Sequence, residues 1–188
     1  MQTTHTTKHI YIVLSQTGTV LSQLLKVITK APYNHASISL SEDLTEMYSF
    51  GRRRPYNPIW AGFVVESPGK GTYKRFPHTE AKVFAVEVSE EAYAKISTVI
   101  AEMLPLKRRY HYNYVGLVLA AFKISYRPKR CYYCSEFVKD LLVKSAVEGS
   151  ERLPKIVQPV HFLELKHTQL YQGKLKDYAV TNKETVTV

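Results

Sequence analysis

The sequence has few cysteines and no long hydrophobic run. Its two cysteines, Cys131 and Cys134, are too few for the disulfide framework of a small secreted protein or for the four ligands of a structural zinc site. The longest apolar run, residues 115–122, is shorter than the ~20 residues that cross a bilayer. Residues 1–8 are polar and lack the apolar core of a secretory signal. We therefore expect a cytoplasmic protein, peripheral to a membrane at most, that needs no metal or cofactor.

Acidic residues are also scarce relative to basic ones. Asp and Glu number 16 against 26 Lys and Arg, which gives a formal charge of +10. Such an excess favours acidic partners, and it equally serves to keep copies of a soluble protein apart. The basic residues gather in three short clusters, at residues 52–54, 107–109 and 127–130. None of these clusters lies in a nucleic-acid-binding motif, so we expect an anionic membrane surface rather than nucleic acid as a charged partner.

Hydrophobic periodicity predicts one α+β domain. Hydrophobic residues make up 45% of the 188 residues, which is enough for one core. Alternating or short apolar runs predict strands at residues 10–14, 35–40, 46–50, 82–88 and 175–180. Helical spacing predicts helices at residues 20–29, 90–104, 112–122 and 135–146. The domain is expected to span residues 1–180, with residues 51–71 as a long loop over a site and residues 181–188 as a frayed tail.

Cys134 stands at the start of the clearest predicted helix, residues 135–146. A helix start offers unpaired backbone N–H groups and the positive end of the helix dipole. Both favour the thiolate, which is the form of cysteine that attacks a carbonyl. The same N–H groups stabilise the oxyanion that this attack creates. Cys134 is therefore either a nucleophile or, as free cysteines often are, a buried and inert packing residue.

His35 is the histidine whose setting suits a base for this thiol. It opens an alternating strand that presents Ser37 and Ser39 on the same face, so its ring projects from a rigid edge. His111 and His161 are rivals, because they lie closer to the cysteine helix along the chain. Spacing alone leaves the choice among these three histidines open.

Three segments of the chain follow one another as motifs do in a known superfamily. They are residues 33–40 (Tyr-Asn-His-Ala-Ser-Ile-Ser-Leu), 112–114 (Tyr-Asn-Tyr) and 133–138 (Tyr-Cys-Ser-Glu-Phe-Val). Over residues 10–163 the chain resembles the circularly permuted branch of the NlpC-type, papain-like superfamily, which includes relatives of lecithin retinol acyltransferase and YiiX-like bacterial proteins. In that branch the strand with the catalytic histidine precedes the helix with the catalytic cysteine, as His35 precedes Cys134 here. Asn113 stands where the family usually has an aspartate after an aromatic residue.

The resemblance implies a fold and a site. The implied fold is permuted papain-like, with a small antiparallel sheet or half-barrel packed against the cysteine helix and flanking helices. Cys134 and His35 are the implied catalytic pair, and a third polar group on the strand after His35 orients the imidazole. Glu46 is preferred for that group over Tyr48 and Ser49, although a slip of one residue in the hairpin turns it outward. The expected oxyanion or site-lining residues are Tyr112, Ser135 and Ser49.

The segment of residues 51–71 departs from the family pattern. It carries three arginines and the single tryptophan of the chain. Arg52 and Trp60 within it are the candidates for a substrate groove, and a solvated loop is the alternative interpretation of the same residues.

These residues together predict a cysteine hydrolase, of the amidase or peptidase kind, or an acyltransferase. The expected substrate is a small molecule, peptide or lipid-like compound with an amide or ester, which passes through a covalent acyl-enzyme. Two alternatives stay open. One is a non-catalytic module of the same fold that binds lipid or peptide through its basic and aromatic surface. The other is a dithiol redox protein that uses the C-x-x-C formed by Cys131 and Cys134.

Overall fold

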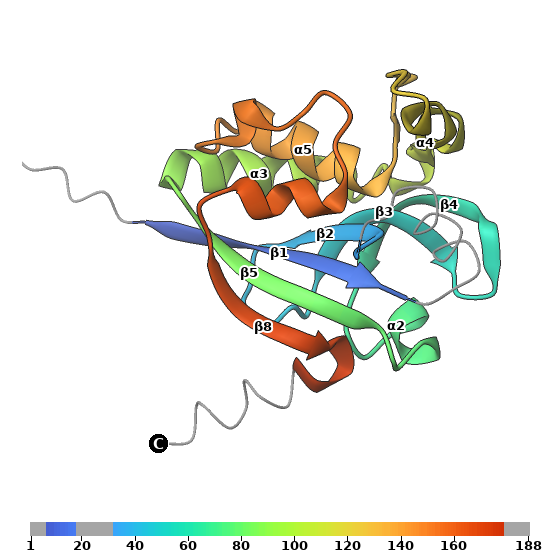
Figure 1. Cartoon of the computed structure of the whole chain (residues 1–188), viewed down its shortest axis with the longest axis horizontal. Coiled ribbons are helices and arrows are strands. Elements are labelled where there is room, and N and C mark those ends of the chain that lie inside the picture. The colour runs from blue at the N-terminus through green and yellow to red at the C-terminus, as the bar shows by residue number, and fades with distance from the viewer. Residues whose placement is uncertain (1–6, 18–31, 179–188) are drawn as a thin grey trace, which may run out of the picture.

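The computed structural model describes residues 7–17 and 32–178 as an α+β structure with one mixed, eight-stranded sheet (Figure 1). The strand order is β7-β6-β4-β3-β2-β1-β5-β8, and paired strands are antiparallel except for β6 and β7, which run parallel. The expected α+β class is therefore confirmed. The strands are β1 (Lys8–Gln16), β2 (His35–Ser39), β3 (Met47–Arg54), β4 (Asn57–Glu66), β5 (Glu80–Val88), β6 (His111–Tyr112), β7 (Cys131–Tyr132) and β8 (Thr168–Lys174).

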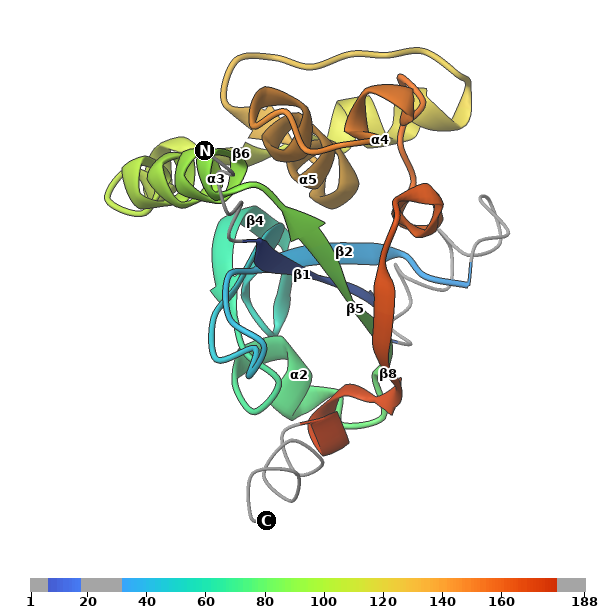
Figure 2. The ribbon, with the colours of Figure 1, turned by 90° about the vertical axis from the view of Figure 1, so that its left-hand side faces the viewer.

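Helices lie on both faces of this sheet (Figure 2). α3 (Glu90–Met103) and α5 (Cys134–Lys144) cover one face, α2 (Gly71–Arg75) lies on the other, and α4 (Tyr114–Ala121) follows β6. The 3-10 segments are η1 (Lys107–Arg109), η2 (Ser150–Arg152) and η3 (Pro159–Glu164). The helix expected at residues 20–29 and the tail expected at residues 181–188 lie outside the described residues. Within residues 7–17 and 32–178, no helix has the length and apolar character needed to pass through a bilayer.

Local capping signals set the starts of α3 and α5. Ser89 Oγ accepts a hydrogen bond of 3.1 Å from the backbone N–H of Ala92 at the start of α3. Glu136 Oε2 accepts one of 3.4 Å from the backbone N–H of Tyr133, the residue before α5. Both helices bury one apolar face, which is what their helical spacing predicts.

β2 directs its side chains alternately to the two sides of the sheet, as the sequence pattern predicts. Ala36 and Ile38 are fully buried in the hydrophobic cluster that also contains the inward face of α5. Ser37 and Ser39 alternate with them and are fully buried too. Buried hydroxyl groups need hydrogen-bond partners, and the partner of Ser37 belongs to the candidate site described below.

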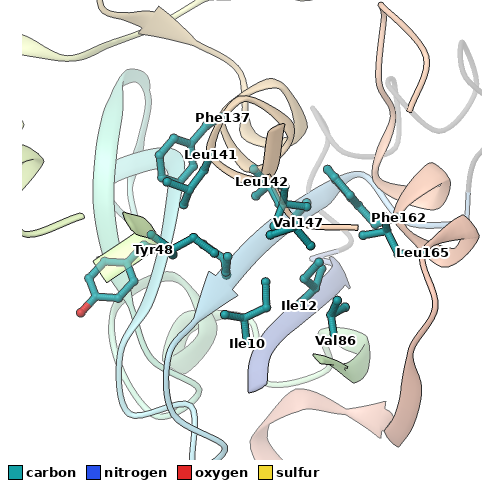
Figure 3. Close-up of a cluster of buried hydrophobic side chains, with 14 of the residues drawn as sticks. Ile10, Ile12, Tyr48, Val86, Phe137, Leu141, Leu142, Val147, Phe162 and Leu165 are labelled. Atoms are coloured by element: carbon teal, nitrogen blue, oxygen red, sulfur yellow. The ribbon is translucent and has the colours of Figure 1, made fainter. Parts of the chain in front are cut away.

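The larger hydrophobic cluster fills the space between the sheet and the helices α3 and α5 (Figure 3). It joins Ile12 of β1 to Phe137 of α5. The ring of Phe137 also contacts the rings of Phe50 and Phe63, with centroid distances of 5.2 and 5.6 Å. This packing fixes α5, and with it the position of Cys134, relative to the sheet.

Two segments differ from the sequence-based expectation. Residues 51–71 are not a long loop, because they contain the second half of β3 and all of β4, which pair from Met47↔Glu66 to Arg54↔Asn57. Arginine, proline and asparagine at the tip of this hairpin hide its strand pattern. The last strand is β8 rather than residues 175–180, because residues 175–178 are helical and bury Leu175 and Tyr178 against the second face of the sheet.

Candidate active site

Cys134 is the first residue of α5, and its sulfur faces the start of β2. The Sγ atom lies 3.9 Å from the carbonyl oxygen of Asn34, to which the thiol donates. The backbone N–H groups of Ala36 and Ser135 also hydrogen-bond the sulfur. Cys134 is 4% exposed, and polar groups hydrogen-bond its sulfur. The expected placement of this thiol at a helix start is confirmed.

Ser135 contributes to the site through its main chain. Its backbone N–H points to the Cys134 sulfur, whereas its Oγ donates a hydrogen bond of 2.8 Å to the carbonyl oxygen of Val157. The side chain therefore holds the start of α5 against the segment that follows η2.

The imidazole of His35 lies between the thiol and a carboxylate. A side-chain hydrogen bond joins it to Cys134, and its Nε2 atom lies 2.9 Å from Glu66 Oε2. Because Nε2 contacts the carboxylate, Nδ1 is the ring nitrogen that remains for the sulfur. The backbone of His35 is fixed by its pairing with Ser15 of β1. The structure thus brings together the two residues that the sequence predicts as nucleophile and base.

The two rival histidines lie in other settings. His161 Nδ1 accepts a hydrogen bond of 3.0 Å from the backbone N–H of Gln158 in η3. His111 is exposed in β6, where it pairs with Gly62 of β4 and Cys131 of β7. Among the described residues, His35 is the histidine that hydrogen-bonds Cys134.

Glu66, the last residue of β4, supplies the carboxylate at His35. Its Oε2 atom also accepts hydrogen bonds from Ser37 Oγ at 2.9 Å and from Ser49 Oγ at 2.7 Å. Three donors from β2 and β3 thus converge on one oxygen, which fixes the carboxylate and through it the imidazole ring. Ser49 contacts the site, as expected, through this carboxylate.

The expectation for Glu46 is corrected by this geometry. Glu46 precedes β3, and its Oε2 atom accepts a hydrogen bond of 2.7 Å from Tyr48 Oη, two residues along the chain. The carboxylate that contacts His35 comes instead from Glu66 of β4. β3 lies between β4 and β2 in the sheet, so the Glu66 side chain extends across β3 to the imidazole. Sequence reasoning does not find Glu66, because it predicts a loop rather than a hairpin at residues 51–71.

The hydrogen-bonded chain shifts the protonation of all three groups. Burial raises the pKa of the Cys134 thiol, but the hydrogen bond and charge of His35 outweigh it and hold that pKa below its ordinary value. Burial lowers the pKa of His35, but the charge of Glu66 and its other neighbours raise it well above 6.5. Burial also raises the pKa of Glu66, and His35 brings it below its ordinary value. The site therefore favours a thiolate–imidazolium pair beside an ionised carboxylate.

Tyr112 brings a hydroxyl group to the sulfur. Its side chain hydrogen-bonds Cys134, and burial together with the charge of Cys134 raises the pKa of Tyr112 well above 10. The phenol therefore stays protonated and remains a donor. Asn113, the next residue, caps α4. Its Oδ1 accepts a hydrogen bond of 2.9 Å from the backbone N–H of Gly116, and its Nδ2 donates one of 2.7 Å to the carbonyl oxygen of Tyr126.

Two further residues shape the site and had no clear sequence signal. Tyr73 of α2 is buried, and its Oη lies 3.2 Å from Ser15 Oγ; burial and the charge of Glu66 raise its pKa to about 12. Gly51 lies beside both groups, because a Cβ there would be in van der Waals contact with His35 Cε1 at 3.5 Å and with Glu66 Oε1 at 3.4 Å.

Arg52 and Trp60, the two substrate-groove candidates, line one cavity of about 670 Å³. Glu66 and Tyr73 line the same cavity, which connects it to the carboxylate end of the candidate site. The arginine and the tryptophan therefore share a hollow with one member of the hydrogen-bonded chain. Whether it receives a substrate stays a prediction.

No metal cluster accompanies these groups: within residues 7–17 and 32–178, no three His, Cys, Asp or Glu side chains gather as metal ligands do. Cys131 and Cys134 are both free thiols. Comparison of the chain with family models, with curated proteins and with solved structures gives no match.

Proposed function

We propose that this protein is a cysteine-dependent hydrolase or acyltransferase that uses Cys134 as nucleophile, His35 as base and Glu66 as the residue that positions His35. The observation that carries the proposal is the hydrogen-bonded chain from the sulfur through the imidazole to the carboxylate. A buried thiol that served only as packing would need neither a lowered pKa nor a fixed base.

We also propose that the fold is the permuted papain-like one. Two features support this: the histidine strand β2 precedes the cysteine helix α5 in the chain, and α5 packs against β2 and β3. The antiparallel strands β1 to β4 then form the sheet on which the cysteine helix rests.

The first half of the reaction forms a thioester. The Cys134 thiolate attacks an amide or ester carbonyl, and a C–S bond forms as the carbonyl π electrons move to oxygen. The N–H groups that surround the sulfur and the Tyr112 hydroxyl are the donors nearest to this oxyanion. The oxyanion then collapses, the bond to the leaving nitrogen or oxygen breaks, and His35 gives that atom its proton.

The second half releases the acyl group. Neutral His35 takes a proton from water, or from the hydroxyl or amine of an acceptor, as this nucleophile attacks the thioester carbon. The C–S bond breaks and Cys134 returns as thiolate opposite the imidazolium. Ionised Glu66 stabilises the positive imidazole in both halves without itself changing protonation.

Alkylation kinetics test the proposed base. We expect His35→Ala to slow the reaction of Cys134 with iodoacetamide by about 10- to 100-fold near pH 6.5, because an ordinary thiol is only ~1% thiolate there. The lowered pKa of Cys134 means that the wild-type rate falls only as the pH drops through that value, whereas the variant rate rises towards pH ~8.5. Mass spectrometry of the labelled protein gives the rates, and an unchanged rate in His35→Ala would remove His35 from its role.

A Cys131→Ser background serves as the control for this measurement and for the dithiol alternative. It leaves Cys134 as the one reactive thiol and should keep the wild-type alkylation profile. The acyl-transfer proposal is preferred because the side chains that hydrogen-bond Cys134 are His35 and Tyr112. Reduction of a small disulfide by the wild type that is lost in Cys131→Ser, without turnover of small thioesters and amides, would instead support dithiol chemistry.

A separate observation favours a second function, attachment to an anionic membrane surface. Apolar side chains are exposed along one face of α4 and the segment after it: Val115 (59%), Val118 (61%), Phe122 (72%), Ile124 (52%) and Tyr126 (48%). The tip of the β3–β4 hairpin adds Ile59 (80%) and Trp60 (48%). A hydrogen bond of 2.9 Å from Tyr114 Oη to the carbonyl oxygen of Ile59 joins α4 to this hairpin tip. We call these seven exposed residues the apolar rim.

Basic residues accompany the apolar rim. Lys123, Lys129 and Arg130 are exposed in the segment that links α4 to β7. Apolar and aromatic side chains that enter the headgroup region, with cations beside them that face anionic lipids, are typical of proteins that bind a membrane from one side. Charge complementarity thus favours an anionic bilayer as the partner of this surface.

Vesicle co-sedimentation tests the apolar rim. We expect Val118→Asp to reduce binding to vesicles of phosphatidylglycerol by about 10-fold, because a charge at the headgroup boundary opposes insertion. The matched control is Val143→Asp, which places the same charge at a valine of α5 that is 43% exposed and outside the rim. Binding should also weaken with added salt. Equal binding by both variants and wild type would contradict a membrane role for α4.

A further inference from the structure

The cavity beside Glu66 is unusually rich in positive charge. It lies between the β3–β4 hairpin, α2 and η1, and its volume is about 670 Å³. Its basic lining residues are Arg52, Arg53, Lys70, Lys107 and Arg108. Glu66 is the one acidic residue among the described residues that line it. Five cations thus face one carboxylate across a single hollow.

The carboxylate of Glu66 hydrogen-bonds groups other than the cavity cations. The Oε2 atom of Glu66 accepts hydrogen bonds from His35, Ser37 and Ser49, so this oxygen is engaged by the hydrogen-bonded chain. The cavity wall therefore keeps an excess of positive charge that an anion can neutralise.

Arg53 is held in place by neutral groups. Its Nη2 donates a hydrogen bond of 2.7 Å to the carbonyl oxygen of Lys107 and one of 2.5 Å to the carbonyl oxygen of Tyr110. Gly62 leaves room for this guanidinium, because a Cβ there would overlap Arg53 Nη2 and the Tyr110 carbonyl oxygen. Burial and the charge of Arg108 lower the pKa of Arg53, as expected where like charges crowd. The guanidinium is thus oriented in advance, and its charge is left for a ligand.

The cavity also borders the hydrogen-bonded chain at its carboxylate end. Glu66 and Tyr73 belong both to its wall and to the surroundings of His35. Tyr112, the residue that hydrogen-bonds Cys134, also acts electrostatically on Arg52 of the cavity lining. A substrate with an anionic group in this cavity is therefore held beside the carboxylate that positions His35.

We propose that this cavity binds a phosphate group carried by the acyl substrate. This inference rests on the proposed function and assigns the substrate class of the same site. A carboxylate brings one negative charge to this cavity, whereas a phosphate brings up to two and offers three acceptor oxygens to the guanidinium and ammonium groups of the lining. Arginine binds phosphate oxygens in pairs, and the two lysines of the lining add point charges.

Titration with inorganic pyrophosphate tests the cavity. We expect Lys70→Gln and Arg108→Gln each to weaken pyrophosphate binding by about 3- to 10-fold, as measured by calorimetry at low salt. The chain offers matched controls. Lys74→Gln on α2, which begins directly after Lys70, and Arg109→Gln on η1 with Arg108 remove the same charges from exposed residues outside the cavity lining. Equal weakening by all four variants, or no binding to the wild type, would overturn the proposal.

A vesicle arm distinguishes the sources of the phosphate. If a lipid headgroup supplies it, Lys70→Gln and Arg108→Gln also reduce binding to phosphatidic acid vesicles, and the controls do not. If a water-soluble phosphate ester supplies it, these variants weaken pyrophosphate binding alone. Failure of the proposed function is distinguishable from failure of this inference. In that case iodoacetamide does not alkylate Cys134, whereas pyrophosphate still binds the cavity.

Discussion

Glu66→Gln is expected to lower turnover of acyl substrates by about 10²- to 10⁴-fold with the fold intact. Glutamine keeps the shape of the side chain but loses the negative charge that raises the pKa of His35. Its amide also offers N–H donors where Oε2 accepts from three partners. The imidazole then loses both its fixed tautomer and the stabilisation of its protonated form, and both are needed for proton transfer to the leaving group.

Glu46→Gln is the matched control for this variant. Glu46 accepts a hydrogen bond from Tyr48 and should change turnover by no more than about twofold. The measurements are kcat/KM on a panel of small thioesters and amides and the pH profile of Cys134 alkylation. The alkylation profile of Glu66→Gln should move to higher pH, because a less stable imidazolium lowers the pKa of the Cys134 thiol less. If Glu66 had only a structural role, the profile would stay in place. Comparable losses in both variants would show that the carboxylate at His35 is not the positioning group.

Phe137→Ala is expected to reduce the free energy of unfolding by about 3–5 kcal/mol. Phe137 is 2% exposed and lies one turn after Cys134 on α5, where its ring meets Phe50 at 5.2 Å and Phe63 at 5.6 Å. Removing it opens a cavity between the helix and β3 and β4, which the aromatic neighbours can fill only in part. Urea denaturation followed by tryptophan fluorescence and circular dichroism measures the loss.

Val143→Ala, on the same helix, is the control for this change. Val143 is 43% exposed, so its truncation should cost less than about 0.5 kcal/mol. We also expect slower alkylation of Cys134 in Phe137→Ala, because the start of α5 is no longer held at a fixed distance from β2. A small stability loss that matched that of Val143→Ala would mean that the aromatic cluster does not hold α5 on the sheet.

The two reacting residues could be predicted from the sequence because each stands at a change of local pattern. Cys134 follows a polar, aromatic segment and precedes an apolar stripe of helical spacing. His35 begins a short run of period two. Such signals lie within a few residues of the side chain concerned, so they do not depend on how distant parts of the chain pair.

The third residue had no comparable signal. Glu66 is 31 residues from His35, and its position depends on the register of β3 with β4 and of β2 with β3. Long-range register is set by pairing and burial across the whole sheet rather than by local propensity. Glu46, which is close in sequence to the histidine strand, was for that reason the wrong choice. The strand expected at residues 175–180 is likewise not formed at residues 175–178, because a helical turn there buries Leu175 and Tyr178.

The convergence of Ser37, Ser49 and His35 on one oxygen of Glu66 links assembly to reactivity. A chain that paired β2, β3 and β4 one position out of step would turn the two hydroxyls away and bury a negative charge without donors. Such a misassembled chain is both destabilised and chemically inert, since its sulfur lacks a base. Immature copies of the protein would therefore present a thiol of ordinary reactivity, and electrophile labelling of Cys134 in nascent chains should become faster once the sheet is complete.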